Sequence, residues 1–211
     1  RVQKVAEAFG CKPIENTLCH EQKKNDLDGE KHIILNPAGE QRSNLPACEI
    51  APYEVYLVDV YVTTGDGRTK KSALRTNLFK KTSTSYQLKT KSARAALNEI
   101  TKGFGNFPFT IRACEDERKT RMGLIECTKM GVAQAFDIHE EKPGEAVGQV
   151  TFTVLVTPNG VERITHGAPF NPKLVQTDKK IEDADLLQLL QTSTKIKKKS
   201  TKKPAAPATS A

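Results

Sequence analysis

The hydrophobic positions of the chain follow two different repeats, one typical of helices and one of strands. Apolar residues within 2–9 recur at the spacing of one helix face, and a glycine follows them as a helix-ending residue. The run 53–64, YEVYLVDVYVTT, is rich in β-branched and aromatic residues and predicts a strand, which a Gly-Asp-Gly turn ends. The run 149–157, QVTFTVLVT, predicts a second strand that ends at Pro-Asn-Gly.

The segment between these two strands has a helical pattern. Residues 92–102 place their apolar side chains on one helix face, and 103–109 interrupts the pattern with two Gly and one Pro. Two further helical segments are predicted at 113–120 and 122–130, as a helix-turn-helix-like pair. Weaker patterns predict extended stretches at 12–18, 33–35, 75–80 and 163–165, a loop at 38–52 and a last helix with Ile181, Leu186, Leu189 and Leu190.

These elements predict an α+β fold, in which a curved antiparallel sheet with covering helices is interrupted by a helical, winged-helix-like insert. Beyond Thr192 the chain is Lys, Ser, Thr, Pro and Ala, a composition that predicts a disordered tail. The expected units are the first part of the sheet at 1–83, the insert at 84–143, the closing strands at 144–170 and a C-terminal extension at 171–211.

The composition excludes some classes of protein. The 211 residues are 37% hydrophobic and 27% charged, and no stretch reaches the ~18 consecutive apolar residues of a membrane helix, so membrane insertion is not expected. No N-terminal signal pattern is present. The five Cys form no C-x-x-C pair, which favours reduced thiols over a disulfide framework or a zinc site.

The positive charge is concentrated in two blocks. Residues 68–121 carry fourteen basic and four acidic side chains, and residues 195–211 carry six Lys and no acid, within a net charge of +8. Clustered cations release counterions when they meet phosphates, so both blocks are candidate nucleic-acid contacts. The alternative is a solubilising charged surface.

Polar residues at strand positions are the candidates for chemistry. Asp59 lies within an apolar strand and shares a face with Tyr61, while Thr151 has a similar position on the second strand and shares a face with Gln149. A buried carboxylate needs a metal, a cation or several donors, although an Asp lining a polar cleft is the simpler interpretation. His20 follows a short apolar segment, and a lone His is more often satisfied than a ligand.

The order of these motifs resembles the C-terminal half of type 2 methionine aminopeptidases and their relatives with the pita-bread fold. The phrases that carry the resemblance are DGEKHIILNP (28–37), EVYLVDVYVTTGDG (54–67), PFTIRACEDERKTRMG (108–123) and FTVLVTPNGVERIT (152–165). Together with the Lys-rich end they are most similar to the proliferation-associated, ErbB-receptor-binding branch of that superfamily. The resemblance implies a C-terminal half of a pita-bread fold, with an N-terminal half of the parent chain absent.

In active aminopeptidases two metal ions are held by two Asp, one His and two Glu. The resemblance implies that both Asp lie in the absent half, that the His is His20, and that the two Glu correspond to Asp59 and Thr151. A second His that contacts substrate corresponds to Asp28. The resemblance therefore implies a degenerate metal site, no cofactor and no aminopeptidase activity.

The resemblance also implies a protein that binds RNA and the large ribosomal subunit, and that moves between cytoplasm, nucleus and nucleolus. No aromatic platform motif for bases is present, so contact with the backbone of structured RNA is expected. The candidate RNA-binding residues are Lys195, Lys197, Lys198, Lys199, Lys202 and Lys203 in the tail, and Arg112, Arg118, Lys119 and Arg121 in the insert.

Leu186, Leu189 and Leu190 fit an L-x-x-L-L motif, a helix-in-groove ligand of the nuclear-receptor type. The same spacing also lets a helix pack on its own core. Receptor and nuclear co-regulator partners are implied by the resemblance alone.

Three functions therefore stand at this point. The leading one is a non-catalytic RNA- and ribosome-binding regulator of growth, translation and transcription on an inactive aminopeptidase scaffold. The alternatives are a divergent metal-dependent methionine aminopeptidase, and a protein-interaction adaptor without a role in RNA binding.

Overall fold

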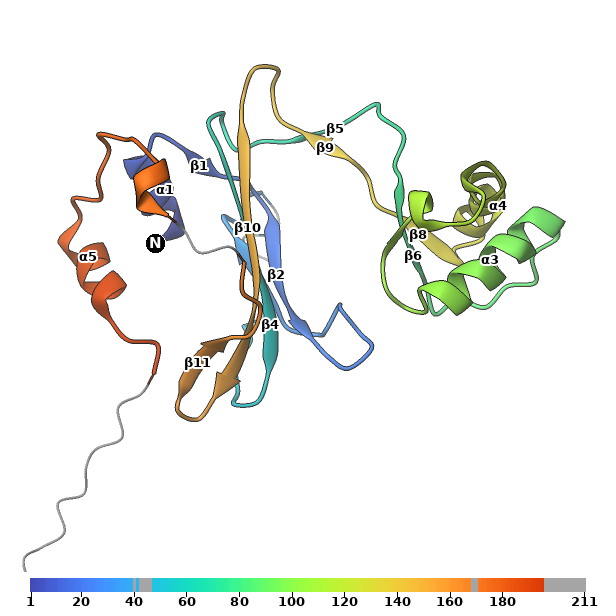
Figure 1. Cartoon of the computed structure of the whole chain (residues 1–211), viewed down its shortest axis with the longest axis horizontal. Helices are drawn as coiled ribbons and strands as arrows, with labels where there is room; N and C mark the ends of the chain where they lie inside the picture. The colour runs from blue at the N-terminus through green and yellow to red at the C-terminus, as the bar shows by residue number, and fades with distance from the viewer. Residues whose placement is uncertain (40, 42–46, 168–170, 196–211) are drawn as a thin grey trace, which may run out of the picture.

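The computed structural model describes residues 1–39, 41, 47–167 and 171–195, and its main feature is an antiparallel sheet. Two long strands form its centre, β4 (Val55–Thr63) and β10 (Val147–Thr157), and they pair directly although the insert separates them in sequence (Figure 1). Both strands consist largely of β-branched residues, which suit a pleated surface. The strands predicted at 53–64 and 149–157 are thus confirmed.

The remaining strands extend this sheet on both sides. On one side β2 (Thr17–Gln22) pairs with β4, and β3 (His32–Leu35) pairs with β2; on the other side β11 (Gly160–Arg163) pairs with β10 as a hairpin. The two-residue β1 (Lys12–Pro13) pairs with the end of β4. Tyr56, Cys19 and Thr63 are among the buried residues of this sheet.

Two helices lie on one side of the sheet, at the left of Figure 1. They are α1 (Val2–Ala8) and α5 (Ala184–Gln191), which confirms the first and last predicted helices. Lys4 of α1 forms an ion pair of 2.9 Å with Asp183, whose carboxylate also caps the first turn of α5. A short 3₁₀ helix, η2 (Pro172–Leu174), precedes α5. No helix within the described ranges is both long enough and apolar enough to cross a membrane.

The insert forms a separate layer on the opposite side of the sheet (Figure 1). It contains α3 (Lys91–Gly103) and α4 (Glu117–Lys129), which pack against each other, and a small sheet of β6 (Leu78–Lys81), β7 (Phe109–Thr110) and β8 (Ala133–Ala135). We include β6 in the insert because it pairs with β7 and β8, although it lies before the start at residue 84 that the sequence suggested. A two-stranded ribbon of β5 (Lys70–Lys71) and β9 (His139–Glu140) connects it to the main sheet. The helical prediction for this region is correct but incomplete, because it missed the small sheet in which β6 pairs with β8, the strands before and after the helices in sequence.

The helix-turn-helix-like pair predicted at 113–120 and 122–130 is wrong. Residues Ile111–Ala113 form a 3₁₀ turn, η1, and α4 then runs without a break through Met122 and Gly123. Asp116 fixes the start of α4 because its carboxylate accepts hydrogen bonds from the N–H groups of Arg118 and Lys119. Gly123 packs directly against α3, where an added Cβ atom would come within 2.4 Å of the Ser92 carbonyl oxygen.

The insert has its own hydrophobic core. Its buried residues come from both helices and the small sheet, and they include Phe79, Ile100, Phe109, Leu124 and Val132. The rings of Phe104 and Phe109 stack with centroids 4.9 Å apart. This core positions α4 and the exposed cations that it carries.

Candidate functional site

The register of the two central strands places the predicted metal positions side by side. Asp59 of β4 is the direct partner of Thr151 of β10, so their side chains point to the same face of the sheet. The Thr151 hydroxyl donates a hydrogen bond of 2.5 Å to the Asp59 Oδ1 atom. The two positions that the family resemblance paired as former metal ligands are thus in direct contact with each other.

Gln149 and Tyr61, the next direct pair on the same face, complete a four-residue cluster. The Gln149 Nε2 atom lies 2.8 Å from Asp59 Oδ1, 2.7 Å from the Tyr61 hydroxyl oxygen and 2.9 Å from the Thr151 hydroxyl oxygen. We call these four residues the β4–β10 polar cluster. Its members satisfy one another, and the one carboxylate among them is Asp59.

Electrostatics within the cluster favour a protonated tyrosine. Burial raises the pKa of Tyr61 to about 12, and a hydrogen bond to Asp59 and the negative charge of Asp59 act in the same direction. The thiol of Cys19, on the neighbouring strand, accepts a hydrogen bond from the Asp59 backbone N–H, and burial raises its pKa. Neither group is therefore prepared to act as an anionic ligand or nucleophile near neutral pH.

His20 and Asp28 take up different positions. His20 of β2 is the partner of Leu57 on β4, two residues from Asp59 and on the same face. Asp28 lies in the loop after β2 and forms an ion pair with Lys80 of β6. Asp28 thus links the main sheet to the insert and does not join the β4–β10 polar cluster.

The donor set of the cluster does not fit a pair of divalent metal ions. Such a pair needs anionic oxygens that bridge both ions, whereas Thr151 and Tyr61 supply neutral hydroxyls and Gln149 supplies an N–H donor. Across the residues that the structure describes, no three side chains of His, Cys, Asp or Glu gather closely enough to hold a metal.

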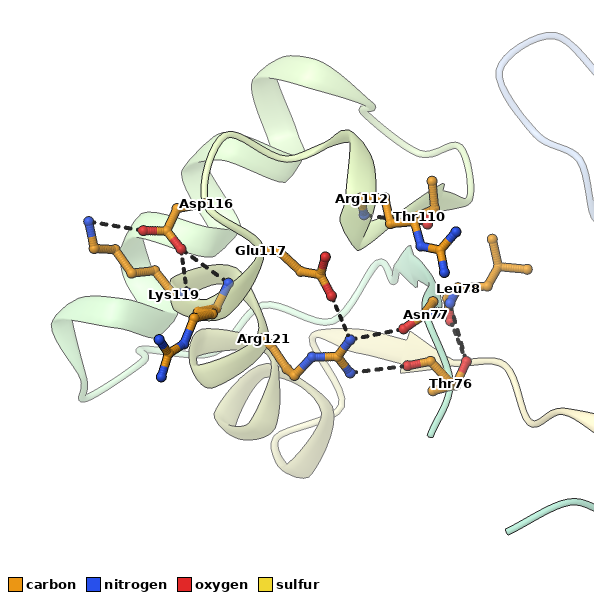
Figure 2. A network of polar contacts seen from close by, with 10 residues as sticks. Thr76, Asn77, Leu78, Thr110, Arg112, Asp116, Glu117, Lys119 and Arg121 are labelled. Atoms are coloured by element: carbon orange, nitrogen blue, oxygen red, sulfur yellow. Dashed lines mark hydrogen bonds and ion pairs between the residues drawn. The ribbon is translucent and has the colours of Figure 1, made fainter. Parts of the chain in front are cut away.

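The predicted RNA-binding residues of the insert divide into two kinds, as Figure 2 shows. Arg121 is half-buried and binds its own protein: its guanidinium donates to Asn77 Oδ1 at 2.9 Å and to Glu117 Oε1 at 3.0 Å, and it also reaches the Thr76 carbonyl at 3.4 Å. Arg121 therefore connects α4 by hydrogen bonds to the segment that enters β6.

The other three predicted RNA-binding residues of the insert lie on the surface. Lys119 forms an ion pair of 3.2 Å with Asp116, one turn earlier, and its side chain is 82% exposed. Arg112 and Arg118 are exposed, and among the described residues their side chains make no hydrogen bond or ion pair. These three residues remain available to a partner, whereas Arg121 does not.

The C-terminal predictions are only partly described. Lys195 is within the described residues, and its backbone bridges to Gly160; Lys197, Lys198, Lys199, Lys202 and Lys203 lie outside them. In the L-x-x-L-L motif, Leu186 is buried, while Leu189 is 42% and Leu190 66% exposed. The motif can present all three leucines to a groove only if Leu186 leaves its packing.

Comparison with known proteins shows which proteins the chain is similar to. A search of protein-family models finds no match. The chain is 39% identical over 205 residues to the protein named ERBB-3 binding protein 1 of Arabidopsis thaliana, which covers 96% of this chain and 50% of that protein. The chain is homologous, over nearly its whole length, to the proteins named ERBB-3 binding protein 1.

Other relatives agree with this similarity. The Curved DNA-binding protein of Schizosaccharomyces pombe is 36% identical over 207 residues, 97% of this chain and 54% of that protein. A solved structure of a thermophilic Arx1 superposes with a TM-score of 0.84 at 34% identity, covering 92% of this chain and 51% of that one. Methionine aminopeptidase 2 of Verticillium alfalfae is more distant, at 27% identity over 164 residues.

These matches confirm the pita-bread, aminopeptidase-like fold expected from the motifs. The chain spans about half the length of the curated relatives that it matches. The similarity therefore extends over nearly the whole chain but over one part of each relative.

Sequence reasoning missed two members of the β4–β10 polar cluster. Gln149 and Tyr61 were placed on the correct strand faces but were not considered as site residues. The signal that identifies them is the strand register: once Asp59 is paired with Thr151, the alternation of side chains brings Gln149 opposite Tyr61.

Proposed function

We propose that the chain is part of a non-catalytic protein that binds RNA and the large ribosomal subunit on an inactive aminopeptidase scaffold. The observation that carries the proposal is a contrast of charge. Two-metal hydrolysis requires several anionic ligands, but the β4–β10 polar cluster contains one carboxylate, which is hydrogen-bonded to neutral groups. The insert, in contrast, presents unpaired cations to solvent.

The loss of hydrolysis follows from the chemistry of the β4–β10 polar cluster. A two-metal aminopeptidase lowers the pKa of a shared water by holding two dications close together with bridging carboxylates. Thr151 removes one negative charge from that set. Even loss of a residue that only orients a metal ligand costs about 10–100-fold in metal affinity or activity, and loss of a bridging ligand costs more.

RNA binding is supported by the exposed side chains of the insert. Arg112, Arg118 and Lys119 lie in a segment with fourteen basic and four acidic residues. Such side chains bind phosphates and position a protein without reading bases. The name of the relative in Schizosaccharomyces pombe, Curved DNA-binding protein, also refers to a nucleic acid.

A salt titration tests the insert. The variant Arg112→Glu/Arg118→Glu should bind structured RNA and large ribosomal subunits more weakly, and the slope of log affinity against log salt should decrease by roughly 0.7–0.9 for each phosphate that the variant no longer neutralises. The control Lys12→Glu/Lys24→Glu makes the same change of charge at exposed positions outside the insert. Equal weakening in both double variants would reject the insert as the RNA-binding surface.

The lysine tail is a second proposed contact. Replacing Lys195, Lys197, Lys198, Lys199, Lys202 and Lys203 by Ala should weaken RNA binding uniformly across sequences and reduce accumulation in the nucleus and nucleolus. An unchanged salt slope in this variant would place the RNA contact elsewhere.

The metal-dependent aminopeptidase is the competing function. It predicts that a full-length preparation supplied with Co²⁺ or Mn²⁺ cleaves Met from peptides, and that Asp59→Ala abolishes the cleavage. That pair of results would reject the non-catalytic proposal, and absence of cleavage in both proteins would support it.

Protein partners form the last part of the proposal. The name of the plant relative refers to a receptor, so we extend receptor and nuclear co-regulator binding to this chain through Leu189 and Leu190 of α5, which are exposed. Exposed apolar residues of the main sheet, such as Val147 and Val150, suit contact with the rest of a longer protein of the relatives' length. An adaptor without an RNA role would bind these partners with normal affinity and show a flat salt titration with RNA.

A further inference from the structure

The Gln149 amide lies at the point where three side-chain oxygens converge. Its Nε2 atom is within 2.7–2.9 Å of Asp59 Oδ1, the Tyr61 hydroxyl and the Thr151 hydroxyl. These oxygens come from two neighbouring strands whose register fixes their separation. Convergence of oxygens from several side chains on one atom is the arrangement that also binds hard cations.

The directions of the hydrogen bonds explain why a donor occupies this point. The Thr151 hydroxyl donates its proton to Asp59, and the Tyr61 hydroxyl oxygen lies 2.7 Å from the Gln149 Nε2 atom. Each hydroxyl oxygen then retains lone pairs that face the interior of the cluster. A side-chain amide supplies two N–H groups and no net charge, so two donors shared among the three oxygens take the place of an ion.

From this geometry we infer that the Gln149 amide acts as an internal, neutral substitute for a cation and keeps metal out of the β4–β10 polar cluster. The inference deepens the proposed non-catalytic function, on which it rests. The amide is a second reason for metal exclusion, besides the absence of a carboxylate at position 151, because a carboxylate restored there would still find the position taken by a hydrogen-bond donor.

An isosteric substitution tests the inference directly. Gln149→Glu replaces the donor by an acceptor of the same shape and leaves two carboxylates and two hydroxyls facing one point. This variant should bind Mn²⁺ at least about tenfold more tightly than the wild type in isothermal titration calorimetry. The matched control is Gln22→Glu, which makes the same change on the same face of the sheet. Gln22 lies on β2 opposite Val55, away from Asp59. Equal Mn²⁺ affinity in the two variants would overturn the inference.

A second pair of variants separates the amide from the missing carboxylate. Thr151→Glu restores an acidic residue beside Asp59 but retains Gln149, whereas Thr151→Glu/Gln149→Ala also removes the amide. The double variant should bind Mn²⁺ at least about tenfold more tightly than the single variant, with thermal unfolding measured for both to verify folding. Equal affinities would show that the amide excludes nothing.

The outcomes distinguish this inference from the proposed function. Wild-type protein that binds Mn²⁺ tightly and, in full-length form, cleaves Met from peptides would overturn both. Wild-type protein that binds no Mn²⁺, together with a Gln149→Glu variant no better than Gln22→Glu, would overturn the inference and leave the non-catalytic function standing.

Discussion

Gly123→Ala should destabilise the insert, because this glycine of α4 packs directly against α3 and leaves no room for a side chain. A Cβ atom at Gly123 would lie 2.4 Å from the Ser92 carbonyl oxygen and 2.7 Å from the Ala96 Cβ atom. Neither atom belongs to a flexible side chain, so α3 and α4 must separate. Overpacking of this kind costs about 3 kcal/mol at the upper end of its usual range. The better helix propensity of Ala returns about 1 kcal/mol, leaving a net loss of about 2 kcal/mol.

Hydrogen exchange measures this loss locally. Amides of α3 and α4 should exchange roughly thirtyfold faster in Gly123→Ala, since each tenfold corresponds to about 1.4 kcal/mol, while amides of β4 and β10 serve as an internal reference. The control is Gly103→Ala at the end of α3, where a Cβ atom meets nothing within 4 Å. That variant should exchange at the wild-type rate or more slowly. Wild-type exchange in Gly123→Ala would refute the close-packing interpretation.

Three further predictions concern polar groups. Arg121→Ala should lower the thermal stability of the insert, whereas Arg118→Ala should leave it unchanged, because only the first guanidinium binds the segment entering β6; equal melting temperatures would contradict this. Asp59→Asn should lower the pKa of Tyr61 from about 12, because a hydrogen bond and a negative charge that favour the neutral phenol are removed, as a tyrosinate absorbance titration would detect. The pKa of Glu54 is lowered from 4.5 to about 2, mainly by a hydrogen bond from a lysine. Ionised Glu54 therefore stabilises the folded state above pH 4.5, and this contribution is lost as the pH falls towards 2. Unfolding midpoints of Glu54→Gln should therefore change less than those of the wild type across this window.

The central strands could be predicted from sequence because their local pattern and their environment agree. Residues 53–64 and 149–157 are β-branched runs ended by glycine turns, and both became long strands. The helix at 92–102 was equally clear because its apolar residues form one face, which packs on α4. In each case the residues that specify the element also bury it.

The insert was harder to predict because its elements depend on distant partners. β6 and β8 are four and three residues long, and they pair across more than fifty residues of intervening chain. The break expected between 120 and 122 is absent because α4 is continuous from Glu117 to Lys129, and its Gly123 packs against the neighbouring helix. Local propensity contains no information about such a contact.

The candidate site also contains residues that the sequence identifies and residues whose role depends on contacts between distant segments. The positions of Asp59 and Thr151 were accessible through the family resemblance, and their contact is present. The role of Gln149 depends on strand register, and the internal role of Arg121 depends on the path of the chain before β6. A set of cations in a sequence therefore identifies a charged surface but does not distinguish a free arginine from one that holds the fold together.

The β5–β9 ribbon has a consequence for the order in which the molecule folds. Asp59 and Thr151 are 92 residues apart in sequence, and the entropy lost in joining chain ends grows with the logarithm of the intervening length. If the insert collapses first and the ribbon pins its ends, the flexible length between β4 and β10 decreases to about 20 residues, which lowers the entropic cost by about 1 kcal/mol. The insert should then act as a folding aid for the sheet, and variants that loosen it should slow refolding more than they accelerate unfolding, as stopped-flow kinetics would measure.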